Sequence, residues 1–173
     1  MANPININPA NIKLTEIAAD LGAALKAQGF MLAMAESCTG GLVAEAMTRI
    51  AGSSAWFDRG FVTYSNAAKI DMLDVAGTTL EKFGAVSEQT AIEMATGALK
   101  SSAAQIAGSI TGIAGPDGGT LGKPVGTVCF AWAGLNLPVS ASTRIFSGNR
   151  EQIRQQAAIY MMAGLIKRLN SSA

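Results

Sequence analysis

Residues 30–50 read FMLAMAESCTGGLVAEAMTRI, and this stretch decides the fold class. It opens with an unbroken apolar run at 30–35, which is typical of a buried β-strand. A polar, glycine-containing turn follows at 37–41, and glycine permits the positive backbone angles that such a turn requires. Apolar residues then recur at helical spacing over 41–50. A buried strand that leads through a tight turn into a helix indicates an α/β protein.

The same alternation of strands and helices continues along the chain. The predicted helices lie at 11–28, 41–50, 66–73 and 87–101 and from residue 149 onward, and the predicted strands at 30–35, 56–64, 106–110, 125–133 and 139–146. The turn at 134–136 predicts that the last two strands form an antiparallel hairpin. We therefore expect a three-layer α/β/α sandwich around a mixed, mostly parallel sheet of about five strands. Residues 1–10 are predicted to be a flexible lead-in, and 11–173 a single domain.

Histidine is absent from the whole chain of 173 residues. This absence excludes a Ser-His-Asp triad, a Cys-His pair and a histidine zinc site within one chain. A nucleophilic hydroxyl would then depend on lysine, tyrosine or a carboxylate as its base. The net charge of +1 is far too small for binding that depends on neutralising nucleic-acid phosphates. We expect a small-molecule ligand, no nucleic-acid or membrane partner, no metal and no cofactor.

The cysteines and the N-terminus indicate the cellular compartment. Cys38 and Cys129 lie far apart and form no C-x-x-C motif, as expected for a reduced, cytosolic protein. The first residues contain no basic segment followed by an apolar one, so no signal peptide is predicted. No apolar run reaches the roughly 18 residues of a membrane-spanning helix. These features predict a cytoplasmic protein and are compatible with a homo-oligomer.

Ser37 lies in the turn between the first predicted strand and the helix that follows it. Free N–H groups and the positive end of that helix can stabilise an oxyanion or bind a phosphate there. Thr39, Gly40 and Gly41 belong to the same turn, and their backbone can approach a ligand closely. In the alternative interpretation, Ser37 or Thr39 is only the helix N-cap and the glycines only form the turn. Cys38 is a rival nucleophile, because a helix N-terminus lowers the pKa of a thiol.

Lys69 is predicted to lie in the first turn of the helix at 66–73. With Asn66 as the N-cap, this lysine is the third helical residue, where the macrodipole disfavours a cation. Burial near a strand end would lower the lysine pKa further, as a general base requires. Tyr64 ends the preceding strand, and its hydroxyl can relay a proton or hold the lysine. The alternatives are a lysine whose stem reaches solvent and a tyrosine that is only a core aromatic.

Residues 111–123 (TGIAGPDGGTLGK) form a glycine-rich loop after a buried strand, where α/β proteins commonly bind ligands. The backbone N–H groups of this loop, with Thr111, Gly112 and Gly115 as candidate binding residues, can form an anion-binding concavity. Arg150 lies at the start of the last helix and can clamp a phosphate. The alternative interpretations are a flexible connection and a solvated arginine.

Five short motifs occur in an order that characterises a known family. They are AESCTGG at 35–41, TYSNAAK at 63–69, TGIAGPDGG at 111–119, GKPVGTV at 122–128 and SGNR at 147–150. Together they resemble the CinA C-terminal domain family, and the resemblance covers roughly residues 12–169. It implies a three-layer α/β/α sandwich that hydrolyses the carboxamide of nicotinamide mononucleotide to nicotinate mononucleotide and ammonia. It also implies that Ser37, Lys69 and Tyr64 are functional residues.

The residues and the resemblance together predict a metal-free serine–lysine amidohydrolase. In this hypothesis, neutral Lys69 accepts the proton of Ser37, and backbone N–H groups of 39–41 hold the oxyanion. The glycine-rich loop and Arg150 hold the substrate phosphate. The rival hypothesis is a non-catalytic nucleotide- or phosphate-binding module that acts through protein partners. Only the enzyme requires a neutral Lys69, so the protonation state of this lysine distinguishes the two.

Overall fold

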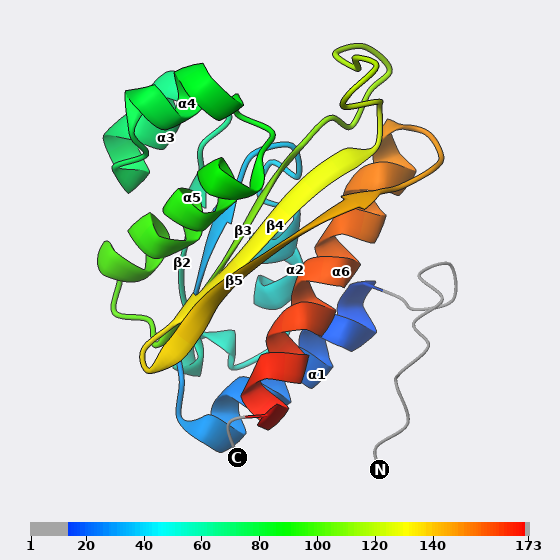
Figure 1. Ribbon diagram of the computed structural model, residues 1–173. Helices are drawn as coiled ribbons and strands as arrows, with labels where there is room; N and C mark the ends of the chain where they lie inside the picture. Colours follow the sequence, from blue (N-terminus) through cyan, green and yellow to red (C-terminus); the bar gives the residue numbers. More distant parts are fainter. Residues whose placement is uncertain (1–13, 172–173) are drawn as a thin grey trace.

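The computed structural model describes residues 14–171. The lead-in predicted for 1–10 and the ends of the domain predicted for 11–173 lie outside this range. No helix of the described range is long and apolar enough to cross a membrane. The elements, shown in Figure 1, are α1 (Leu14–Gln28), β1 (Leu32–Glu36), α2 (Leu42–Thr48), the short 3-10 helix η2 (Ser53–Ala55), β2 (Phe57–Val62), α3 (Asn66–Leu73), α4 (Gly77–Phe83), α5 (Glu88–Lys100), β3 (Ile106–Gly112), β4 (Thr127–Gly134), β5 (Leu137–Ile145) and α6 (Arg150–Ser171).

The strands form one mixed sheet in the order β2-β1-β3-β4-β5. β1 pairs in parallel with both neighbours, so that Met34 lies beside Gly60 of β2 and beside Gly108 of β3. β4 runs antiparallel to β3 and to β5, and the predicted hairpin joins β4 to β5. Its turn contains Asn136 at a positive φ of 64°, a conformation that asparagine tolerates well. The other four strands share one direction, so the prediction of a mixed, mostly parallel sheet is confirmed.

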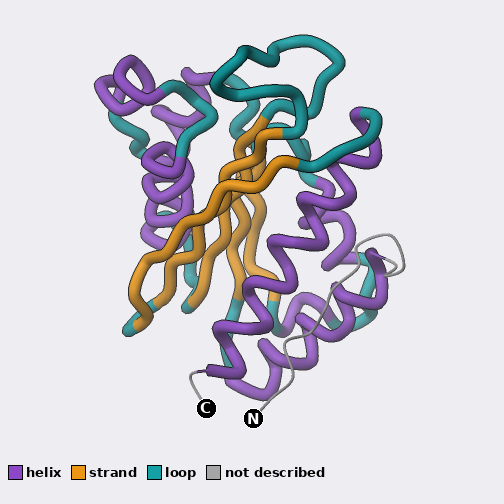
Figure 2. The backbone as a smooth tube through the Cα atoms, turned by 45° about the vertical axis from the view of Figure 1, so that its right-hand side comes forward, coloured by secondary structure: helices purple, strands orange, loops and turns teal. Residues whose placement is uncertain are grey.

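Helices cover both faces of this sheet, as Figure 2 shows. α1, α2 and α6 pack on one face, whereas α3, α4 and α5 lie on the other. Side chains of β1 alternate accordingly: Leu32 and Met34 join the core beneath α1, α2 and α6, while Ala33 and Ala35 belong to the core on the α5 side. Because alanine is small, α5 can approach the sheet closely. The three-layer sandwich predicted from the sequence is confirmed.

The helix α4 was not predicted from the sequence, and its N-terminus explains why. Ala76 precedes the helix and offers no side-chain cap. Glu93 of α5 supplies the missing acceptor, since its carboxylate receives the Ala76 N–H at 2.8 Å and the Thr79 hydroxyl at 2.6 Å. A cap contributed by another helix leaves no local sequence signal, because the usual N-cap residues are recognised beside the helix they begin.

The N-cap of α3 is Ser65, so the prediction of Asn66 was wrong by one residue. The Ser65 backbone is extended, with φ −91° and ψ 163°, and its Oγ accepts the N–H of Ala68 at 3.0 Å. Both Ser65 and Asn66 are good capping residues, and only the backbone conformation distinguishes them. Lys69 is consequently the fourth residue of the helix and not the third.

Candidate active site

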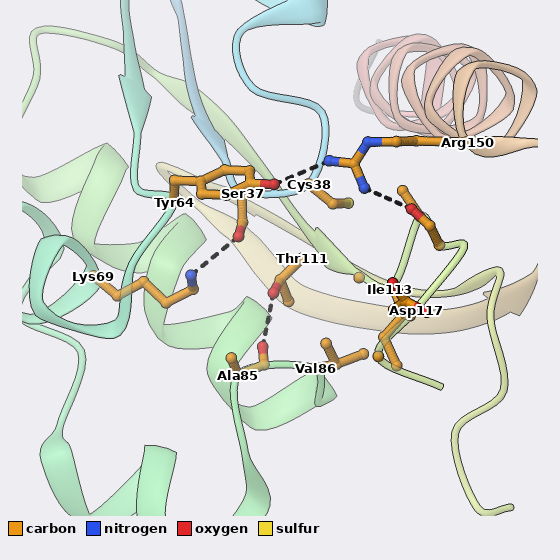
Figure 3. A pocket seen from close by; sticks show the side chains of 14 residues that line it. Ser37, Cys38, Tyr64, Lys69, Ala85, Val86, Thr111, Ile113, Asp117 and Arg150 are labelled. Atoms are coloured by element: carbon orange, nitrogen blue, oxygen red, sulfur yellow. Dashed lines mark hydrogen bonds between the residues drawn. The ribbon is translucent and has the colours of Figure 1, made fainter. Parts of the chain in front are cut away.

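A pocket of about 270 Å³ lies where the parallel strands β1, β2 and β3 end (Figure 3). Parallel strands end at the same edge of a sheet, which brings together the residues that follow them. The predicted site residues that line the pocket are Ser37, Tyr64, Lys69, Thr111, Gly112, Gly115 and Arg150. The wall also includes residues that the sequence interpretation did not assign to ligand binding: Cys38, Ala85, Val86, Ile113, Ala114, Asp117 and Gly118.

Ser37 and Lys69 form the polar pair of this pocket. The Lys69 side chain is 1% exposed, and its Nζ lies 3.0 Å from Ser37 Oγ and 2.8 Å from the carbonyl oxygen of Thr63. As an ammonium, Nζ donates to both oxygens. As a neutral amine, it still donates to Thr63 but offers its lone pair to the hydroxyl, which then becomes the donor. The neutral form is therefore arranged to receive the Ser37 proton.

The surroundings of Lys69 favour this neutral form. Burial lowers the lysine pKa, because a charged ammonium loses its hydration inside the protein. Lys69 takes part in none of the ion pairs found among residues 14–171, so no carboxylate opposes that effect. Helical side chains tilt toward the N-terminus of their helix. Lys69 consequently runs back from α3 toward the end of β2 and reaches Ser37.

Cys38, the rival nucleophile, is in an unsuitable environment. Burial raises the pKa of its thiol to about 12, and the negative charge of Glu36 raises it further. A backbone hydrogen bond and the positive charge of Arg154 lower this pKa, but their effects are smaller than that of burial. Because the thiolate is the reactive form of cysteine, a thiol with this pKa is almost entirely unreactive at neutral pH. The structure therefore favours Ser37 over Cys38.

Glu36, which the sequence interpretation overlooked, occupies the N-terminus of α2. Its buried carboxylate accepts the N–H groups of Gly41, Val43 and Ala44 at 3.1, 3.2 and 2.9 Å. A carboxylate at a helix N-terminus is stabilised both by free N–H donors and by the macrodipole. The signal was present in the sequence as an acidic residue between a buried strand and a helix start. Its effect is to fold the chain tightly around the turn that carries Ser37.

This arrangement corrects the predicted roles of Thr39, Gly40 and Gly41. Gly40 donates its N–H to the Ser37 carbonyl at 3.0 Å, and Gly41 donates to Glu36, so neither donor is free for an oxyanion. All three residues lie outside the pocket wall. Gly41 has a φ of 96°, which only glycine adopts easily, and this shows that its contribution is to the turn.

Glu36→Gln is expected to lower the free energy of unfolding by about 2–3 kcal/mol. The amide keeps one accepting oxygen, while its NH₂ group faces backbone donors and leaves at least one buried N–H unsatisfied. Urea denaturation followed by circular dichroism measures the difference. Glu45→Gln in the same helix is the matched control, because its ion pair with Arg49 is exposed and contributes little. Equal stabilities for the two variants would contradict the capping role of Glu36.

Arg150 connects two walls of the pocket. It is the first residue of α6, whose N-cap Asn149 accepts the N–H of Gln152 at 2.9 Å, as the sequence predicted. Arg150 Nη1 donates to the Gly115 carbonyl at 2.8 Å, and Nη2 donates to the Tyr64 hydroxyl at 3.0 Å (Figure 3). The Tyr64 hydroxyl is therefore hydrogen-bonded to Arg150 and not to Lys69. The lysine is instead held by its hydrogen bond to the Thr63 carbonyl.

Two further side chains stabilise the pocket wall. Thr111 lies at the end of β3, and its hydroxyl donates to the Ala85 carbonyl at 2.7 Å, which joins β3 to the segment before α5. Arg154 of α6 donates to the carbonyl oxygens of Cys38 and Thr39 at 3.1 and 2.8 Å. The turn after β1 is therefore held from two sides, by Glu36 and by Arg154. The role of Arg154 could not be predicted because its partners are distant in the sequence.

The fold and the pocket together define a class: a three-layer α/β protein with a buried serine–lysine pair at the carboxyl edge of its sheet. The CinA C-terminal domain model matches residues 14–169, and the chain belongs to this family. The resemblance inferred from the five motifs is confirmed.

Individual relatives agree with this assignment. The chain is 57% identical to the nicotinamide-nucleotide amidohydrolase PncC of Enterobacter agglomerans over 150 residues. This alignment covers 87% of this chain and 92% of the relative. It is 53% identical over 153 residues to the protein of the same name from Escherichia coli K12, with 88% and 93% covered. Among solved structures, the competence/damage inducible protein CihA from Agrobacterium tumefaciens superimposes with a TM-score of 0.87 at 49% identity, with 91% and 95% covered.

Proposed function

We propose that this chain hydrolyses the carboxamide of nicotinamide mononucleotide to nicotinate mononucleotide and ammonia. The observation that carries the proposal is the pair of Lys69 and Ser37 in the pocket, with 3.0 Å between Nζ and Oγ. The 57% identity to a nicotinamide-nucleotide amidohydrolase supports the choice of substrate. The test is to incubate the purified chain with nicotinamide mononucleotide and to measure ammonia and nicotinate mononucleotide, which should appear in equal amounts. Absence of both products would contradict the proposal.

Acylation begins when neutral Lys69 takes the proton of the Ser37 hydroxyl. Ser37 Oγ then forms a bond to the amide carbon, and the carbonyl oxygen becomes an oxyanion. The protonated lysine gives its proton to the amide nitrogen, the carbon–nitrogen bond breaks, and ammonia leaves. The product of this step is an ester of Ser37 with the nicotinoyl group.

Deacylation reverses the proton transfers with water in place of ammonia. Neutral Lys69 takes a proton from the attacking water, and the resulting tetrahedral intermediate breaks its bond to Ser37 Oγ. The lysine then returns the proton to Oγ, and the carboxylic acid gives up its own proton to the released ammonia or to solvent, so the product leaves as a carboxylate. The proton balance closes without a metal ion or an organic cofactor.

The oxyanion requires donors near Ser37, and the turn after β1 supplies the candidates. The N–H groups of Ser37, Gly40 and Gly41 are already bonded within the protein. We assign the role to the backbone N–H group of Cys38, which follows the nucleophile directly and lines the pocket. Backbone donors of a rigid turn are oriented before the reaction begins, and this lowers the barrier to forming the oxyanion. Glu36 and Arg154 maintain that orientation.

Arg150→Ala is expected to weaken binding of nicotinamide mononucleotide by about 10- to 100-fold, because hydrogen bonds to a charged group contribute about 1.5–3 kcal/mol. Nicotinamide riboside lacks the phosphate, so its affinity should fall much less. Dissociation constants for both ligands are measured by calorimetry on a Ser37→Ala chain, to prevent turnover. Lys167→Ala removes an exposed charge from the same helix and should affect neither ligand. Equal losses for both ligands would contradict a phosphate contact and leave Arg150 as the bridge between Tyr64 and Gly115.

The rival hypothesis of a non-catalytic phosphate-binding module is less well supported. An anion-binding lysine would keep its charge and reach solvent, whereas Lys69 is buried and its pKa is lowered.

A cytoplasmic location and assembly into a homo-oligomer stay predictions from the sequence.

A further inference from the structure

Tyr64 combines exposure with a fixed position. Its side chain is 62% exposed although the residue lines the pocket, and its hydroxyl accepts a hydrogen bond from Arg150 at 3.0 Å. The same guanidinium holds the Gly115 carbonyl at 2.8 Å. The ring is therefore anchored at the end of β2 through its backbone and at Arg150 through its hydroxyl. An aromatic ring held in place with an uncovered surface is ready to pack against a ligand.

The proposed reaction forces the substrate ring close to this tyrosine. The amide carbon must approach Ser37 Oγ to roughly 3–3.5 Å. In a nicotinamide nucleotide that carbon is bonded directly to the pyridinium ring, which must then lie in the same small pocket as Ser37 and Tyr64. Figure 3 shows the Tyr64 side chain extending across the pocket from the end of β2 toward Arg150.

The charges around the pocket suit a cationic ring. A protonated Lys69 would repel a pyridinium ion, but burial favours its neutral form. Asp117 is the acidic residue of the pocket wall, and it takes part in none of the ion pairs of residues 14–171. Arg150 contacts the hydroxyl of Tyr64, and none of the cation–π contacts found among residues 14–171 involves the Tyr64 ring, so no protein cation occupies its face. The face of a tyrosine ring attracts a cation through its quadrupole.

We propose that the face of Tyr64 binds the positively charged pyridinium ring of the substrate by a cation–π contact. Through this contact the pocket selects oxidised nicotinamide nucleotides over their reduced forms, in which the ring is neutral. The inference rests on the proposed function and adds to it a residue that determines specificity. Typical cation–π contacts correspond to a preference between about 3-fold and 30-fold in affinity.

The test compares two ligands that carry the same phosphate and ribose. Dissociation constants for oxidised and reduced nicotinamide mononucleotide are measured by calorimetry on three chains: Ser37→Ala, Ser37→Ala with Tyr64→Phe, and Ser37→Ala with Tyr64→Leu. The first two should prefer the oxidised ligand by about 3- to 30-fold, since phenylalanine keeps the ring. In the Tyr64→Leu chain the ratio should fall close to one. Because both dissociation constants are measured on the same variant, a fraction of unfolded protein affects both ligands equally and leaves their ratio unchanged.

Two results would overturn the inference: an unchanged ratio in the Tyr64→Leu chain, or loss of the ratio in the Tyr64→Phe chain. The second would assign the preference to the hydroxyl and its bond with Arg150. Ammonia release by the unsubstituted chain is measured in parallel. If nicotinamide mononucleotide is hydrolysed but the Tyr64→Leu ratio is unchanged, only the inference fails. If neither nucleotide binds and none is hydrolysed, the proposed function fails with it.

Discussion

Replacement of Ser37 by alanine is expected to reduce ammonia release from nicotinamide mononucleotide by at least about 1,000-fold. The substitution removes the atom that forms the acyl intermediate, and loss of a nucleophile in serine hydrolases has effects of this size or larger. Lys69 keeps its bond to the Thr63 carbonyl, so the cost in stability should be only about 1 kcal/mol. The measurements are the steady-state rate of ammonia formation and a urea denaturation curve.

Cys38→Ala is the matched control for this experiment. The thiol is adjacent to Ser37, but its pKa is raised to about 12, so its removal should leave the rate within a few-fold of the original. An inactive Cys38→Ala chain together with an active Ser37→Ala chain would reverse the assignment and make the thiol the nucleophile. Rapid quenching with acid should trap the nicotinoyl ester on Ser37 in the unsubstituted chain.

Lys69→Met and Lys69→Arg are expected to be as inactive as Ser37→Ala. Methionine fits the buried site of Lys69 but cannot accept a proton, and arginine does not deprotonate in a useful pH range. Both variants should still bind the nucleotide, because the base acts on Ser37 and not on the phosphate. Lys100→Arg is the control, since Lys100 is an exposed lysine paired with Asp74. Substantial turnover by Lys69→Arg would eliminate the serine–lysine mechanism.

The pH dependence of the rate should report the protonation state of Lys69. The pKa of this lysine is lowered from its ordinary value by burial. Only the amine form above that pKa can accept the Ser37 proton, so the rate should rise tenfold per pH unit below the pKa and become constant above it. The profile is obtained from kcat/KM, which refers to the free enzyme. A rate that falls as the pH rises through neutrality would contradict a lysine base.

Much of the fold could be predicted because it depends on short stretches of the chain. The apolar run at 30–35 corresponds to β1, and the caps Ser87 and Asn149 begin α5 and α6 as expected. Helical periodicity, strand length and capping are properties of adjacent residues, so the sequence displays them directly. α4 was missed because Glu93, which caps it, belongs to another helix.

Most of the predicted site residues line the pocket, but Thr39, Gly40 and Gly41 do not, and several hydrogen-bond partners within the site were not predicted. Ser37 and Lys69 were selected from the sequence, and the structure places them in direct contact. Tyr64 was expected near the lysine, and its hydroxyl instead bonds Arg150. The N–H groups of Gly40 and Gly41 were expected to be free, but they donate to the Ser37 carbonyl and to the overlooked Glu36. Each difference concerns the partner of a polar group, and partners depend on the arrangement of elements in space.

The sequence by itself determined the α/β class, the order of the elements apart from α4 and η2, the exclusion of histidine chemistry and the nature of the candidate nucleophile and base. These follow from composition and from patterns a few residues long. Only the tertiary structure decided which groups meet. Because β1 lies between β2 and β3, Ser37 reaches a lysine that is 32 positions away, and Arg150 reaches a tyrosine that is 86 positions away. The lowered pKa of Lys69 also depends on the tertiary structure, because it results from burial by elements that are distant in the sequence.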